Sequence, residues 1–243
     1  MLDPQAALFA VLWGAAGWLA AIPLNVVIHQ LPRENAVGFR PRCEKCGAVI
    51  PLVALRNVGT CRCGHPRRYD RVEWLLAAAF LPLGVRFGPS WALLAYSLYT
   101  MILLGIAAID LRHRYVYRLT TLPPLVLALF LTPILVGANF RVDVLFTVAG
   151  AILCAGIFGA LYVAGRLIWR GQEPIGRGDI EVAALVGAME AFPRAVGALI
   201  LGSVINAGFI AVLLATRRRR AGDYIPYGPG LCLGAYVTFF FPP

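Results

Sequence analysis

The chain has 243 residues, of which 60% are hydrophobic and 14% are charged, and its formal net charge is +10. The mean hydropathy of +0.75 excludes an ordinary water-soluble globular protein, which needs many more polar side chains to cover its surface. The composition therefore predicts an all-α, polytopic membrane protein embedded in a lipid bilayer.

Apolar segments long enough to cross about 30 Å of hydrocarbon recur along the whole sequence. About eight transmembrane helices are expected, at residues 6–31, 72–88, 90–109, 121–138, 142–168, 179–192, 194–215 and 228–241. The segment 179–192 is short enough to be tilted or re-entrant. The first segment lacks a basic start and a small-residue cleavage site, so we expect it to stay as a helix rather than leave as a signal peptide. The expected parts are a first transmembrane helix (1–32), a cytoplasmic loop (33–71) and a transmembrane domain (72–243).

The distribution of Lys and Arg predicts the orientation. With the N-terminus outside, all basic residues except Arg86, Arg141 and Arg194 fall in segments that face the cytoplasm. The positive-inside rule favours this orientation over its opposite. The run RRRR at 217–220 is typical of a cytoplasmic helix end near anionic lipid headgroups, so no nucleic-acid partner is expected.

The loop 33–71 is rich in cysteine. Cys43 and Cys46 have the CxxC spacing, and Cys61 and Cys63 form a tighter CxC pair in which His65 is a possible substitute ligand. Thiols stay reduced in the cytoplasm, and four thiolates in two close pairs suit a tetrahedral, structural zinc ion. We therefore predict a small zinc-ribbon-like loop, with reduced thiols that bind no metal as the alternative.

Two aspartates stand at the ends of apolar segments. Asp110 closes the run WALLAYSLYTMILLGIAAID, and Asp179 opens the run DIEVAALVGAM. In the predicted topology both reach the cytoplasmic edge of the bilayer, where two carboxylates from distant segments can meet. Ionisable groups at membrane depth are costly and mark functional sites by default.

Each aspartate also has a structural explanation. Asp179 can be the N-cap of its helix, and Asp110 can be an interfacial residue paired with Arg112 or Arg114. Gly176 and Gly178 let backbone approach closely around Asp179, which an N-cap alone does not require, so we count both as site-shaping residues.

Two adjacent carboxyl groups that share one proton can act as an aspartic protease pair. One carboxylate takes a proton from water and the other carboxyl group donates one to the oxygen of the scissile carbonyl. Asp110 and Asp179 are thus the candidate catalytic residues.

Small residues inside the apolar segments are interpreted as packing residues. Cys154 and Cys232 are expected to be buried like small hydrophobes. Several glycines are expected to allow close helix packing. These are Gly150, Gly156, Gly159, Gly165, Gly197, Gly202 and Gly208.

Five motifs in order resemble those of the type IV prepilin peptidases, a family of membrane aspartic proteases with a Gly-x-Gly-Asp motif. The motifs are LNVVIHQLP (24–32), VEWLLAAAF (72–80), AAIDLRHRYVYRLTTLP (107–123), GRGDIEVAALVGA (176–188) and IPYGPGLCLGAY (225–236). The resemblance places Asp110 and Asp179 at the two catalytic positions and makes 72–243 a peptidase domain.

The resemblance implies cleavage of prepilin or pseudopilin leaders at the cytoplasmic face of the bacterial inner membrane, after a glycine and before the hydrophobic helix of the substrate. It also implies N-methylation of the new terminus with S-adenosylmethionine in many members, although the loop here is shorter than usual. Two positions depart from the family pattern. Val116-Tyr117-Arg118 stands in place of Ile-Pro-Asp/Asn, and Glu181 stands where Lys is common.

Two other classes of function compete with a peptidase. A small transporter or proton-relay protein would use Asp110 and Asp179 as titrating sites, but it needs a path to both faces of the membrane. A catalytically silent assembly protein with a zinc loop would hold the two aspartates apart.

Overall fold

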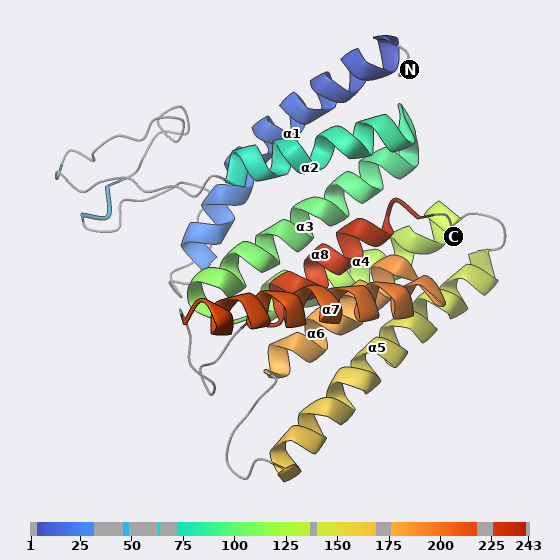
Figure 1. Ribbon diagram of the computed structural model, residues 1–243. Helices are drawn as coiled ribbons and strands as arrows, with labels where there is room; N and C mark the ends of the chain where they lie inside the picture. The colour runs from blue at the N-terminus through green and yellow to red at the C-terminus, as the bar shows by residue number, and fades with distance from the viewer. Residues whose placement is uncertain are drawn as a thin grey trace. The chain divides into compact units, whose positions relative to one another are not determined.

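The computed structural model describes residues 4–31, 46–48, 63, 72–136, 140–168, 176–217 and 226–241 (Figure 1). Helices make up the regular structure in these ranges, and no strand occurs there. The helices are α1 (Pro4–Gln30), α2 (Val72–Phe87), α3 (Trp91–His113), α4 (Arg118–Val136), α5 (Phe140–Ile168), α6 (Arg177–Glu190), α7 (Arg194–Ala215) and α8 (Gly228–Thr238). The all-α class and the eight predicted helical segments are confirmed, with ends that differ by no more than four residues.

Within the described ranges, five helices are long and apolar enough to cross a membrane. Their candidate spans are Pro4–Ile28, Trp91–His113, Arg118–Leu135, Asp143–Ile168 and Arg194–Ala215. The other three, α2, α6 and α8, contain 16, 14 and 11 residues. At 1.5 Å per residue they reach only about 24, 21 and 17 Å, less than the thickness of the hydrocarbon layer. The expectation that all eight helices are transmembrane therefore stays a prediction.

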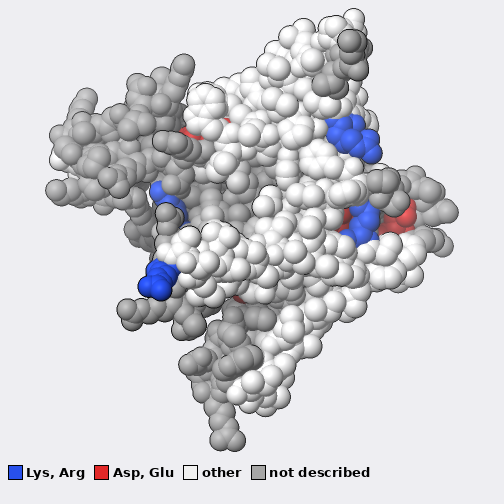
Figure 2. All heavy atoms as spheres, in the orientation of Figure 1, with Lys and Arg blue, Asp and Glu red and all other residues white. Residues whose placement is uncertain are grey.

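The described surface is that of a membrane protein. Large apolar side chains are exposed along the candidate spans, among them Ile152 on α5 and Val204 on α7. Figure 2 shows that uncharged side chains form most of the described surface on the visible face. Because water would not tolerate so much exposed apolar surface, lipid is the solvent for these helices.

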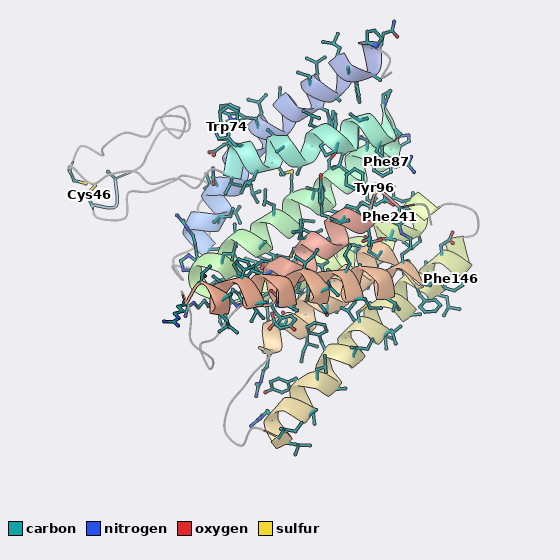
Figure 3. All side chains as sticks on the ribbon, in the orientation of Figure 1. Cys46, Trp74, Phe87, Tyr96, Phe146 and Phe241 are labelled. Carbon is teal, nitrogen blue, oxygen red and sulfur yellow. The ribbon has the colours of Figure 1, made fainter. Side chains whose placement is uncertain are left out.

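The chain forms two compact units, Met1–Met101 and Ile102–Pro243. In the first unit, α1 and α2 pack along each other, with Gly17 of α1 directly against the ring of Phe80. The amide of Asn25 donates a hydrogen bond to the carboxylate of Glu73, which joins the end of α1 to the start of α2. Phe87 of α2 stacks on Tyr96 of α3 at a centroid distance of 4.8 Å (Figure 3).

In the second unit, α6 is the central helix. It contacts α4, α5, α7 and α8, and every residue from Leu185 to Glu190 is buried. A helix that is apolar on all sides is stable only when neighbouring helices or lipid surround it. The position of Asp179 in the first turn of α6 is therefore set by four neighbouring helices.

Glycines set the spacing of these helices. A Cβ atom on Gly150 of α5 would lie 2.5 Å from the carbonyl oxygen of Gly187 in α6, and one on Gly234 of α8 would lie 2.5 Å from the nitrogen of Gly202 in α7. Close packing is thus confirmed for Gly150 and Gly202, where backbones touch. It is wrong for four predicted positions, whose Cβ would meet no described atom within 4 Å: Gly156, Gly159, Gly197 and Gly208.

Candidate active site

Asp110 lies in the last turns of α3 and is 1% exposed. Its Oδ2 accepts the backbone N–H of Gly228, the first residue of α8, at 3.2 Å. The two residues are so close that a Cβ atom on Gly228 would lie 2.6 Å from the same oxygen. The alternative for Asp110 was an ion pair with Arg112 or Arg114. In the described structure its carboxylate instead binds the backbone of α8.

Asp179 is the third residue of α6 and is 3% exposed. The N-cap is Gly176, so the alternative that Asp179 caps the helix itself is wrong by three positions. The Oδ2 of Asp179 instead reaches back and accepts the N–H of Gly176 at 3.0 Å. This is the acidic half of a capping box, which the glycine cannot complete because it has no side chain.

The two aspartates are close enough to interact electrostatically, and both also act on the thiol of Cys232 in α8. All three groups are buried. Cys232 was predicted to be a packing residue, and it is buried as expected. Its electrostatic interaction with the two carboxylates follows from the packing of α8, which the apolar sequence around Cys232 did not indicate.

Neither aspartate has a cation as an ion-pair partner in the described parts of the chain, whereas Arg118 pairs with Glu181 and Arg194 with Glu190. Two buried carboxyl groups that interact electrostatically are costly to ionise together, so the pair favours a state in which one of them keeps its proton. Such a pair can take a proton from one molecule and give one to another.

The glycines before Asp179 differ in what they do. Gly176 supplies the backbone donor to Asp179. A Cβ atom on Gly178 would lie 2.6 Å from the Cβ of Val116, in the turn between α3 and α4. The connection between α3 and α4 therefore packs directly on the first turn of α6.

Glu181 and Arg118, the two departures from the family pattern, contact each other. The Arg118 Nε lies 3.2 Å from Glu181 Oε1, and the hydroxyl of Thr121 donates to Glu181 Oε2 at 2.6 Å. The sequence alone did not relate these positions, which are 63 and 60 residues apart. The Glu181 carboxylate is thus bound by α4.

The predicted zinc ligands fall mostly outside the described residues. Cys46, which Figure 3 labels, and Cys63 are exposed, whereas Cys43, Cys61 and His65 lie outside the described ranges. Among the residues that the structure describes, no group of three or more His, Cys, Asp or Glu side chains is placed to hold a metal ion. The zinc site stays a prediction.

Comparisons with known proteins show which family the chain resembles. The model of the type IV leader peptidase family matches residues 97–212, which include Asp110 and Asp179. The chain is similar to the prepilin leader peptidase/N-methyltransferase of Pseudomonas aeruginosa, with 28% identity over 91% of this chain and 87% of that protein. The protein of the same name from Burkholderia pseudomallei (strain 1026b) is 31% identical over 90% of this chain and 81% of its own length.

A third relative, the prepilin leader peptidase/N-methyltransferase of Aeromonas hydrophila, is 29% identical over 88% of this chain and 84% of that protein. No solved structure matches the chain. The similarity extends over most of the chain and of each relative, so it is not confined to the two aspartate motifs. The chain belongs to the type IV leader peptidase family.

Proposed function

We propose that the protein is an intramembrane aspartic endopeptidase that removes the leader peptide of type IV prepilins or pseudopilins, with Asp110 and Asp179 as its catalytic pair. Family membership supports the reaction, and the names of the relatives support the substrate. One observation carries the choice of residues: two buried carboxylates from distant segments interact with each other, and within the described ranges no cation neutralises either.

The pair hydrolyses a peptide bond by moving protons. The ionised carboxylate takes a proton from a water molecule, and the protonated carboxyl group gives its proton to the oxygen of the scissile carbonyl. The water oxygen bonds to the carbonyl carbon to form a tetrahedral diol. A proton then passes to the leaving nitrogen, the C–N bond breaks, and the products are an acid and an amine, with one proton again shared by the pair.

Backbone donors hold the two carboxylates for this reaction. The Gly228 N–H at the start of α8 binds Asp110, and the Gly176 N–H at the start of α6 binds Asp179. Helix starts favour negative charge, so they orient the carboxylates without a cation that would suppress their basicity. Because these donors belong to packed helices, the geometry is fixed before substrate arrives.

We place the site at the cytoplasmic edge of the inner membrane, with the N-terminus outside. The apolar helices and the relatives indicate a bacterial inner membrane protein. The positive-inside rule supports the orientation, since Arg112, Arg114 and Arg118 follow Asp110 directly. A prepilin leader in the cytoplasm would reach this edge, and the bond before its hydrophobic helix would lie at the same depth as the two aspartates.

Transfer of a methyl group from S-adenosylmethionine to the new N-terminus is the second activity in the names of the relatives, and we extend it to this chain. We also propose that Cys43, Cys46, Cys61 and Cys63 bind a structural zinc ion. The exposure of Cys46 and Cys63 suits ligands in a surface loop. We expect about one zinc ion per protein molecule, and its loss in a Cys43→Ser, Cys46→Ser variant; a metal-free parent would contradict the zinc site.

The decisive experiment incubates the purified protein with a model prepilin, with and without S-adenosylmethionine, and determines the product masses. We expect loss of the leader in both cases and the added mass of a methyl group only with the methyl donor. Asp110→Asn and Asp179→Asn should each stop cleavage. Full cleavage by either variant would exclude the catalytic pair, and cleavage without added methyl mass would exclude the second activity alone.

A further inference from the structure

We propose that Glu181 is a positioning residue for the aspartic pair. Its carboxylate ties the first turns of α6, which carry Asp179, to the first turns of α4, which follow Asp110. This inference rests on the proposed peptidase function and deepens it, since Glu181 acts through the two aspartates rather than by touching substrate.

The tie consists of two contacts on one carboxylate. The Thr121 hydroxyl donates to Glu181 Oε2 at 2.6 Å, and Arg118 Nε donates to Oε1 at 3.2 Å. Both partners lie in the first turn of α4, and Glu181 is two residues after Asp179. Each oxygen of the carboxylate thus has a partner on the same neighbouring helix, which fixes the rotation and height of α6 relative to α4.

A backbone contact supports the tie from the other side of Asp179. Gly178 packs on Val116 so closely that its Cβ would overlap the Val116 side chain. Gly178 therefore packs on the connection between α3 and α4, and Glu181 binds α4 itself. Both contacts are with the part of the chain that follows Asp110. Together these contacts determine the separation of the two catalytic carboxylates.

The two contacts on Glu181 are not equal in strength. The Arg118 side chain is 81% exposed, and exposed ion pairs contribute little because water competes for both charges. Thr121 is 1% exposed, and a hydroxyl that donates to a carboxylate in such surroundings makes a strong hydrogen bond. The Thr121 bond is therefore the main part of the tie, and it requires an acceptor oxygen at position 181 rather than a charge.

This distinction sets the expected kinetics of prepilin cleavage. Glu181→Ala and Thr121→Val should each lower kcat about 10- to 100-fold, because small displacements of catalytic groups have effects of this order. KM should stay within about twofold of the parent value, since Glu181 does not touch substrate and the affinity for substrate should not change. Glu181→Gln keeps an oxygen for Thr121 and should restore kcat to within about threefold of the parent.

The double variant supplies a second readout. If Glu181 and Thr121 act through one hydrogen bond, Thr121→Val adds little further loss in a Glu181→Ala background, as expected for residues in contact. Thr216→Val is the control, because Thr216 directly follows α7 and its hydroxyl, within the described structure, donates to carbonyls of that helix alone. The control should cleave at the parent rate. All variants are compared as folded protein, after their unfolding temperatures are measured.

Three results would overturn the positioning role: parent-like kcat in Glu181→Ala, a rise in KM in place of the fall in kcat, or a loss in Glu181→Gln as large as in Glu181→Ala. The test also separates this inference from the proposed function. A parent protein that cleaves no prepilin removes both, whereas an active parent that loses activity in Asp110→Asn but not in Glu181→Ala removes only the role of Glu181.

Discussion

The two ends of α6 each bury a carboxylate, and they treat it in opposite ways. At the first turn, Asp179 accepts one backbone hydrogen bond and interacts with a second carboxylate, Asp110. At the last residue, Glu190 accepts a hydrogen bond from Thr238 at 2.6 Å and lies 3.0 Å from Arg194 Nη2. One acid is set against another acid, and the other is set against a base.

The Glu190 end is built to hold helices together. Arg194 begins α7 and also donates to the carbonyl of Thr238 at the end of α8, so one cluster joins three helices. The approach of Arg194 to Glu190 Oε2 is an ion pair without hydrogen-bond geometry. The Arg194 cation beside Glu190 favours the ionised form of this carboxylate, whereas no described cation does so for Asp179.

The difference shows how one short helix can carry a proposed catalytic group at one end and a stabilising ion pair at the other. Removing a carboxylate from water is costly, and at the Glu190 end a positive charge offsets part of this cost. The Asp179 end leaves it partly uncompensated, which a protein tolerates mainly where function requires it. Predictions that exchange or remove these partners test whether the two ends have the roles assigned to them.

The largest effect is expected at the end without a cation. Asp179→Asn or Asp110→Asn should lower prepilin cleavage by at least about 10³-fold, because the pair loses a group that transfers protons. The amide can still accept the backbone N–H, and like-charge repulsion is removed, so the unfolding temperature should stay the same or rise. Cleavage assays and thermal unfolding in detergent measure both. A variant that is inactive only because it unfolds would contradict this prediction.

Removal of the other acid should give the opposite pattern. Glu190→Ala leaves the mostly buried Arg194 without its carboxylate partner, and breaking a buried ion pair typically costs about 3–5 kcal/mol of unfolding free energy. Cleavage per folded molecule should remain close to that of the parent, because Glu190 is not part of the proposed pair. Denaturant titration and active fraction measure the two effects. A stable but inactive Glu190→Ala variant would mean that this end takes part in the reaction.

A third change tests the backbone donor to the catalytic pair. Gly228→Ala places a methyl group 2.6 Å from Asp110 Oδ2, so the carboxylate or α8 must move. A shift of about 1 Å lowers catalysis on the order of 10²-fold. Gly208→Ala on α7 is the control, since its Cβ meets no described atom within 4 Å. Equal activity of the two variants would contradict the role of the Gly228 N–H.

Much of the fold could be predicted because the bilayer fixes the length and composition of its helices. The apolar runs located all eight helices, and the alternation of loops predicted that Asp110 and Asp179 would lie near each other. The runs did not distinguish α6 and α8 as short helices, because a helix buried among other helices is as apolar as one that spans lipid.

Contacts between particular side chains could not be predicted in the same way. The bonds from Arg118 and Thr121 to Glu181 depend on the rotation of α4 against α6, which an apolar pattern without a strong polar face leaves open. The same uncertainty affected the glycines: Gly150 and Gly156 look alike in sequence, but only Gly150 faces a neighbouring helix in the described structure. The bond from Gly228 to Asp110 is made by backbone and has no side-chain signal at all.

The smallest effect is expected at Arg118, the exposed arginine of α4 that pairs with Glu181 of α6. Arg118→Met should change the unfolding free energy by less than about 1 kcal/mol, because Arg118 is 81% exposed and solvent replaces it. The same change at Arg194, whose side chain is 16% exposed, leaves Glu190 buried without a cation and should cost about 3–5 kcal/mol. Denaturant titration of the two variants compares them directly. Equal losses of unfolding free energy would mean that burial does not make the Arg194–Glu190 pair stronger than the Arg118–Glu181 pair. The Glu190 end would then not stabilise the helix packing more than the exposed pair does.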